Sequence, residues 1–231
     1  MSEKKQHEIS RMSSLVHQLS EEHGCNLVAD IGCGLGYLGQ TLASVFKQDV
    51  LGFELRESNC QNIRQPYINS SSPNSMITKL LSVDSTPQCT KTLRQAFTEH
   101  CVLKSNSAIS NSSDISNDSA KFTNTAQQMS SDSDSENCRV CLVGLHCCGD
   151  LTPSTLQQFS SIDECKVVVC MSCCYHRLST DGTSFQHFPM SSKLKKDYSR
   201  LAERHGTPIN SLALRLACQE TKSRWVRSNI L

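Results

Sequence analysis

The sequence has little net charge and no long apolar segment. Its 231 residues carry a formal charge of +1, so no overall field favours a strongly acidic or basic partner. A membrane-spanning helix needs about 18–20 consecutive apolar residues, and the sequence has no such run. The opening Met-Ser-Glu-Lys-Lys leads into a polar stretch, which is not the pattern of a secretory signal. We therefore expect no membrane partner.

Cysteine, in contrast, is abundant, at 14 residues. In a chain without a secretory signal, this number indicates reduced thiols in the cytoplasm or nucleus rather than a disulfide framework. Hydrophobic residues make up only 37% of the chain, and the shortage is concentrated in residues 105–137. Ser, Asn and Asp dominate this segment, which predicts a disordered insertion within a single domain that spans residues 1–231.

A glycine-rich turn follows the first short apolar stretch. Leu27–Ile31 reads as a buried strand and Gly36–Phe46 as a helix. Three glycines at alternate positions lie at the junction: Gly32, Gly34 and Gly36. A strand, a glycine turn and a helix bring bare backbone close to a ligand at a helix N-terminus. The alternative is a tight turn with no ligand.

Three acidic residues lie at predicted strand ends, and the first of them, Asp30, favours S-adenosylmethionine (SAM) over a dinucleotide. Asp30 precedes the first glycine, where a carboxylate would repel a pyrophosphate but attract the ammonium group of SAM. Glu54 ends a second predicted strand, where an acid takes both ribose hydroxyls of either cofactor. Asp84 follows a third predicted strand, Met76–Val83. In class I methyltransferases an acid at this position often accepts a hydrogen bond from the adenine amino group. The alternative is that Asp84 is a turn or N-cap aspartate. The Asp30, glycine and Glu54 set resembles the SAM site of those enzymes.

Apolar stretches alternate with helical ones, which predicts an α/β fold with a mostly parallel, Rossmann-like sheet. We expect five strands, the last two at Arg139–Leu145 and Lys166–Met171. Ligands bind beyond the carboxyl ends of parallel strands. The glycine turn, Glu54, Asp84 and two loops rich in Cys and His all follow predicted strands, so we expect them to share one edge of the sheet.

The two loops read Leu-His-Cys-Cys-Gly-Asp at 145–150 and Cys-Cys-Tyr-His at 173–176. In a methyl-transfer site, His146 or His176 would remove a proton from the acceptor or orient it, and Tyr175 would stack on a base or another aromatic group. Loop histidines that bond only to the backbone are the alternative.

Cysteine spacing does not predict a zinc ribbon. Cys138 and Cys141 lie three positions apart along a predicted strand and point to opposite faces. The gap to the second pair, Cys170 and Cys173, is longer than that of a zinc ribbon. We therefore predict no metal site. One alternative stays open, a metal held by residues of the two loops: His146, Cys148, Cys173 or Cys174, and His176.

Several segments resemble a known family. Gly144–Leu151, Cys173–Leu178 and Phe188–Ser191 are similar to the methyltransferase-like protein 25 family, which includes proteins named ribosomal RNA adenine dimethylase domain-containing. Lys4–Glu8 and Arg215–Gln219 also resemble it. The His-x-Cys-Gly and Cys-Cys-x-His loops are shared with a wider kinship that includes tRNA 2′-O-methyltransferases. The resemblance implies a SAM-dependent methyltransferase domain.

RNA is the substrate that this kinship favours, and we expect no DNA partner. The chain has Leu-His-Cys-Cys where amino-methylating enzymes have Asn-Pro-Pro-Tyr or Asp-Pro-Pro-Tyr, which argues against methylation of adenine N6. Residues 191–231 hold nine Lys or Arg against three Asp or Glu, a patch that suits RNA phosphates or is an ordinary solvated face. The alternatives to the enzyme are a catalytically silent scaffold and a zinc- or RNA-binding interaction protein.

The usual length of the family's members affects the number of strands that we expect. Members extend beyond both ends of this chain, and class I sheets usually have seven strands. The resemblance therefore predicts a sheet truncated at its C-terminal strands.

Overall fold

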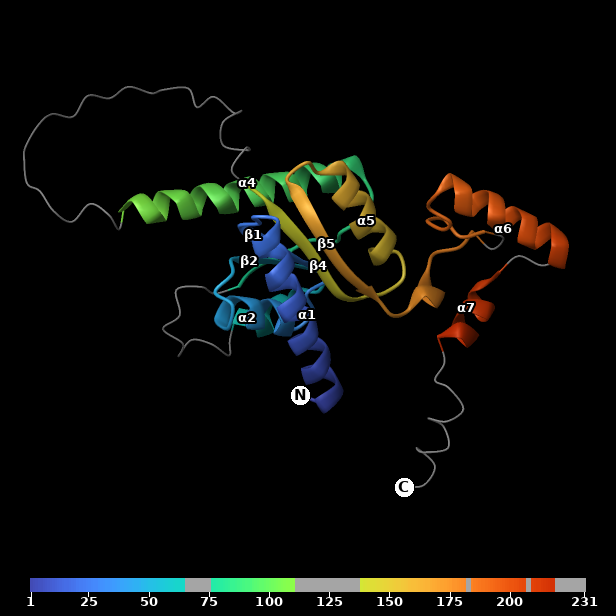
Figure 1. Cartoon of the computed structure of the whole chain (residues 1–231), viewed down its shortest axis with the longest axis horizontal. Helices are drawn as coiled ribbons and strands as arrows, with labels where there is room; N and C mark the ends of the chain where they lie inside the picture. Colours follow the sequence, from blue (N-terminus) through green and yellow to red (C-terminus); the bar gives the residue numbers. More distant parts are fainter. Residues whose placement is uncertain (65–75, 111–137, 182–183, 207–208, 219–231) are drawn as a thin grey trace, which may run out of the picture.

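A parallel sheet of five strands forms the centre of the protein (Figure 1), with the spatial order β3-β2-β1-β4-β5. The computed structural model describes residues 1–64, 76–110, 138–181, 184–206 and 209–218. The strands are β1 (Leu27–Ile31), β2 (Val50–Glu54), β3 (Ile77–Leu80), β4 (Val140–Cys147) and β5 (Cys165–Ser172). Every neighbouring pair of these strands is parallel. The predicted α/β class is confirmed.

Helices cover both faces of the sheet. α1 (Glu3–Glu22) and α2 (Tyr37–Ser44) pack on one face, and α4 (Pro87–Ser110) and α5 (Leu151–Ser161) pack on the other. The remaining elements are α3 (Glu57–Arg64), the short 3-10 helix η1 (Tyr175–Arg177), α6 (Ser192–His205) and α7 (Ser211–Ala217). Figure 1 shows α6 and α7 beyond the end of β5, away from the three packed layers.

The hydrophobic core divides between the two faces because neighbouring residues of a strand point to opposite sides. In β1, Leu27 and Ile31 pack in the same cluster as Phe97 of α4. Val28, between them, packs with Val16 of α1. Both faces of β1 are therefore buried, as in a parallel sheet covered by helices on each side.

Helix α4 extends further than the composition predicts. The hydroxyl of Thr86 accepts from the backbone N–H of Cys89 at 3.2 Å, which caps the helix start. The helix ends at Ser110, so residues 105–110, placed in the disordered insertion by their composition, are helical. Continuing an existing helix adds one hydrogen bond for each residue fixed, without a new nucleus. Residues 111–137 of the predicted insertion lie outside the described residues.

In the described part of the chain, no helix combines the length and the apolar character that crossing a membrane requires.

Candidate active site

The carboxyl ends of the parallel strands bring distant segments to one edge of the sheet. Asp30 lies near the end of β1, Glu54 ends β2, and His146 lies near the end of β4. Tyr175 and His176 belong to η1, shortly after β5. This is the edge where ligands bind in open α/β sheets.

Asp30 is buried, with an exposed fraction of 2%. The backbone N–H of Gly39 donates to its carboxylate, whereas Oδ2 is buried and has no hydrogen-bond partner among the described residues. Burial raises the pKa of Asp30 to about 7, against the lowering effect of the Gly39 N–H and with a further increase from Glu54. Buried polar atoms are nearly always hydrogen-bonded, so the unpaired oxygen is able to accept a hydrogen bond from a ligand.

The turn between β1 and α2 has one open face. Gly32, Gly34 and Gly36 have φ angles between 57° and 72°, and the backbone N–H of Gly32 donates to the Phe53 carbonyl at 2.8 Å. A Cβ added at Gly34 would meet no atom within 4 Å. A positive φ together with open space allows a ligand to approach the backbone here, as the glycine pattern predicts.

Glu54 connects this turn to the start of α3. Its Oε2 accepts from the backbone N–H of Gly34 at 2.9 Å. Its Oε1 accepts from the Arg56 N–H at 2.9 Å and from the Asn59 side-chain amide at 3.2 Å. The side chain is thus fixed against the glycine turn, where a carboxylate can accept hydrogen bonds from a pair of hydroxyl groups.

Asp84 lies past β3, and its bonds are local. Its Oδ1 accepts from the backbone N–H and the hydroxyl of Thr86, at 2.8 and 2.6 Å. Its carbonyl oxygen accepts from the side-chain amide of Gln158 at 2.7 Å. These are the contacts of a turn aspartate that precedes a helix, and its contact with adenine stays a prediction.

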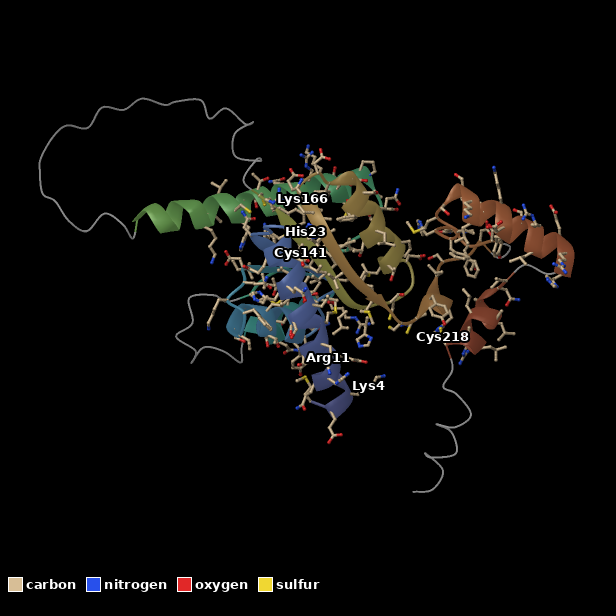
Figure 2. The ribbon with its side chains drawn as sticks, in the orientation of Figure 1. Lys4, Arg11, His23, Cys141, Lys166 and Cys218 are labelled. Carbon is tan, nitrogen blue, oxygen red and sulfur yellow. The ribbon has the colours of Figure 1, made fainter. Side chains whose placement is uncertain are left out.

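His146 meets a residue from the opposite end of the sequence. Its Nε2 lies 3.0 Å from Oε2 of Glu8 in α1, and its φ of +65° is uncommon for a residue other than glycine. Nζ of Lys4 lies 3.8 Å from Oε1 of Glu8. Figure 2 shows Lys4 at the N-terminal end of α1 and His23 at the opposite end of this helix. The sequence alone does not predict this role of Glu8, because the partner of a glutamate on a helix face depends on how the helix crosses the sheet.

Tyr175 and His176 occupy η1 in different surroundings. Tyr175 is exposed, and a hydrogen bond with the Cys218 thiol raises the pKa of its phenol. Figure 2 shows Cys218 at the end of α7, next to η1. Nδ1 of His176 is buried without a hydrogen-bond partner in the part of the chain that the structure describes. Tyr175 also lines a cavity of about 170 Å³ together with Cys147 and Phe188.

The two C-x-x-C pairs do not form a shared site. Cys138 packs in the core cluster on the α4 side of the sheet, and Cys141 packs in the cluster on the α1 side. The opposite orientation predicted from strand geometry is confirmed. The loop cysteines group differently, with Cys173 next to Cys148 of the other loop, at an Sγ–Sγ distance of 3.1 Å.

The sequence matches a model of the methyltransferase domain over residues 4–181. This range contains Asp30, the glycine turn, Glu54 and both loops. The chain belongs to the methyltransferase-domain family. Membership agrees with the five-stranded parallel sheet described above.

Two relatives extend the comparison. Probable methyltransferase-like protein 25 of Mus musculus is 37% identical over 111 residues, which cover 37% of this chain and 18% of that protein. Probable methyltransferase-like protein 25 of Homo sapiens is 36% identical over 111 residues, which cover 38% of this chain and 18% of that protein. The match thus spans under a fifth of each relative. The match agrees with the predicted resemblance to the methyltransferase-like protein 25 family. It gives no support to the predicted resemblance to proteins named ribosomal RNA adenine dimethylase domain-containing.

Proposed function

We propose that this domain is a SAM-dependent methyltransferase. The observation that carries the proposal is the buried carboxylate of Asp30, whose Oδ2 lacks a partner among the described residues at the start of an open glycine turn. An ammonium group supplies the missing donor, whereas a pyrophosphate next to a carboxylate is repelled. Membership in the methyltransferase-domain family supports the same activity.

The residues present fit this cofactor. Asp30 would bind the ammonium group, Glu54 the ribose hydroxyls, and the open face of Gly34 allows the ligand to approach the backbone. Asp84 is the proposed acceptor for the adenine amino group. When bound, SAM supplies a methyl group on a sulfonium sulfur, which an acceptor atom takes as the carbon–sulfur bond breaks.

His146 is the proposed base for the acceptor. Glu8 holds its ring at 3.0 Å, and strained backbone at a non-glycine residue is often retained at functional positions. Tyr175 and His176 are the proposed acceptor-side residues at the end of β5, with Tyr175 lining the adjoining cavity. The proposed acceptor is RNA, which the exposed lysines of α6 would attract.

A thermal-shift titration with S-adenosylhomocysteine tests the cofactor. A ligand at 100 times its dissociation constant adds about 2.7 kcal/mol of stability, which raises the melting temperature by about 5–10 °C for a domain of this size. Gly34→Ala should lose the shift because its Cβ occupies the open face. Gly206→Ala is the matched control, since Gly206 also has a positive φ and no atom within 4 Å of an added Cβ. Unlike Gly34, Gly206 lies at the C-terminal cap of α6 and not in the glycine turn.

The outcomes separate the candidate functions. A shift in the wild type and in Gly206→Ala, but not in Gly34→Ala, supports the cofactor site. No shift in a cooperatively folded wild type contradicts it. A shift without transfer of labelled methyl to RNA or protein pools supports the silent scaffold in place of the enzyme.

A further inference from the structure

We propose that Cys148, Cys173 and Cys174 bind one Zn²⁺ ion through three thiolates, with a fourth coordination position left open. In the described part of the chain these residues form the one group of His, Cys, Asp or Glu whose ligand atoms come close enough to share a metal ion. The proposal concerns a metal site and does not depend on methyl transfer.

The three sulfur atoms converge from two loops. Sγ of Cys173 lies 3.1 Å from Sγ of Cys148 and 3.5 Å from Sγ of Cys174, and all three atoms lie within 4.8 Å of one another. Zn–S bonds of about 2.3 Å in a tetrahedral site put the sulfurs about 3.8 Å apart. The separations of 3.1 and 3.5 Å are shorter than this value by less than 1 Å, and the third is at most 4.8 Å, so each pair of sulfurs lies within about 1 Å of the spacing that the ion requires.

Backbone contacts hold the two loops together independently of any ion. The N–H of Gly149 donates to the Cys174 carbonyl at 3.2 Å, and a Cβ at Gly149 would lie 2.6 Å from the Arg177 carbonyl oxygen. The carboxylate of Asp150 accepts from the backbone N–H of Ser179 at 3.1 Å. The thiols are therefore presented by a prearranged frame, which lowers the entropy lost when a metal binds.

The ligand chemistry selects the metal class. Thiolates are soft ligands that favour Zn²⁺ and Cu⁺ over Mg²⁺ or Ca²⁺, and Zn²⁺ accepts three protein ligands together with an exchangeable one. No fourth described side chain joins the group. The open position is thus available to water or to an incoming nitrogen, oxygen or sulfur atom, whose proton the ion would make easier to remove.

Elemental analysis of the full chain, purified under reducing conditions without chelator, tests the site. We expect one zinc per chain, and Co²⁺ substitution should give the near-ultraviolet charge-transfer band of cobalt thiolates. Cys148→Ser and Cys174→Ser should each reduce that band. Each should also weaken zinc binding by more than about 100-fold, because loss of a residue that only hydrogen-bonds to a metal ligand already costs about 10–100-fold. Cys25→Ser, which removes another partly buried free thiol, is the matched control and should leave both measurements unchanged.

Several results would overturn the proposal. The first is folded wild-type protein that contains no zinc after zinc has been added. The second is wild-type protein that contains copper in place of zinc. The third is an equal zinc affinity in the wild type, Cys148→Ser and Cys174→Ser. A mass deficit of two hydrogens that maps to a Cys148–Cys173 disulfide in protein exposed to zinc would also contradict it. S-adenosylhomocysteine binding is measured on the same samples, so failure of the zinc site and failure of the cofactor site are distinguished.

Discussion

Burial has a larger effect on the pKa of Asp30 than the hydrogen bond and the charge next to this residue. Its pKa rises from 3.8 to about 7, mainly because the charged form is poorly solvated. A carboxyl group whose folded pKa is raised stabilises the fold in its protonated form. That contribution is fully present below about pH 3.8 and is lost as the pH rises through about 7. The ionised form needs a cation next to it, which the proposed ligand carries.

The affinity for S-adenosylhomocysteine should therefore depend on pH. Because protonation of Asp30 competes with binding of the ammonium group, we expect affinity to fall about eightfold between pH 7.5 and pH 6, given a pKa of about 7. Asp30→Asn cannot titrate, so its affinity should be lower at pH 7.5 and nearly constant over this range. Isothermal titration calorimetry at each pH measures both proteins, and an equal pH dependence would contradict the assigned role.

The pair of His146 and Glu8 makes a second prediction at this scale. His146→Asn keeps a side chain that tolerates a positive φ and removes the proposed base, so kcat for methyl transfer to the proposed RNA acceptor should fall about 10²–10⁴-fold. Glu8→Gln keeps the shape and removes the charge of a positioning residue. We expect kcat to fall about tenfold, because the contact at 3.0 Å that orients the His146 ring is weakened.

The control for both variants is binding of S-adenosylhomocysteine, which should match the wild type. Wild-type kcat in His146→Asn would show that another group accepts the proton. Wild-type kcat in Glu8→Gln would show that Glu8 does not position the His146 ring.

At the scale of elements, an ion pair joins α4 to the beginning of β5. Arg94 Nη2 donates to Glu164 Oε1 at 2.8 Å, and Nε lies 3.1 Å from both carboxylate oxygens. Glu164 is largely buried, with a side-chain exposure of 8%. This bidentate contact fixes the long helix α4 against a sheet that it meets mainly through Leu93, Ala96 and Phe97.

Arg94→Ala should lower the free energy of unfolding by about 1–2 kcal/mol, because it leaves the Glu164 carboxylate buried without its partner. Urea denaturation followed by circular dichroism measures the change. Lys91→Ala removes an exposed cation of the same helix and should change stability by less than about 0.5 kcal/mol. A similar loss in the two variants would mean that the loss of a positive charge from α4, rather than the ion pair, accounts for the effect, because alanine itself favours the helix.

Across the whole molecule, positive charge gathers away from the sheet even though the net charge is only +1. Lys193, Lys195, Lys196 and Arg200 are exposed on α6, which Figure 1 shows beyond the end of β5. Such a helix suits the phosphates of the RNA proposed above as the methyl acceptor.

Replacement of Lys195 and Lys196 by Glu should weaken binding of single-stranded RNA. Each lost phosphate contact should also reduce the slope of log affinity against log salt by about 0.7. Fluorescence anisotropy with a labelled oligonucleotide at two salt concentrations measures both quantities. Replacement of Lys91 and Lys166, two exposed lysines outside α6, by Glu is the charge-matched control, and equal losses in the two proteins would mean that only net charge matters.

The sequence by itself determined the features that depend on residues close together in the chain. An apolar stretch buried on both faces predicts β1, and the glycine spacing predicts the open turn at Gly34. The acids at the strand ends follow from the same short patterns, because strand alternation and glycine conformations are properties of a few consecutive residues.

Only the tertiary structure decided which distant side chains meet. Glu8 and His146 are separated by 138 positions, and Arg94 and Glu164 by 70, so their contacts depend on where α1 and α4 cross the sheet. The convergence of Cys148, Cys173 and Cys174 depends on the pairing of β4 with β5. No local pattern encodes these meetings, because the packing of the two helical layers against the sheet sets the distances between segments that the chain itself keeps far apart.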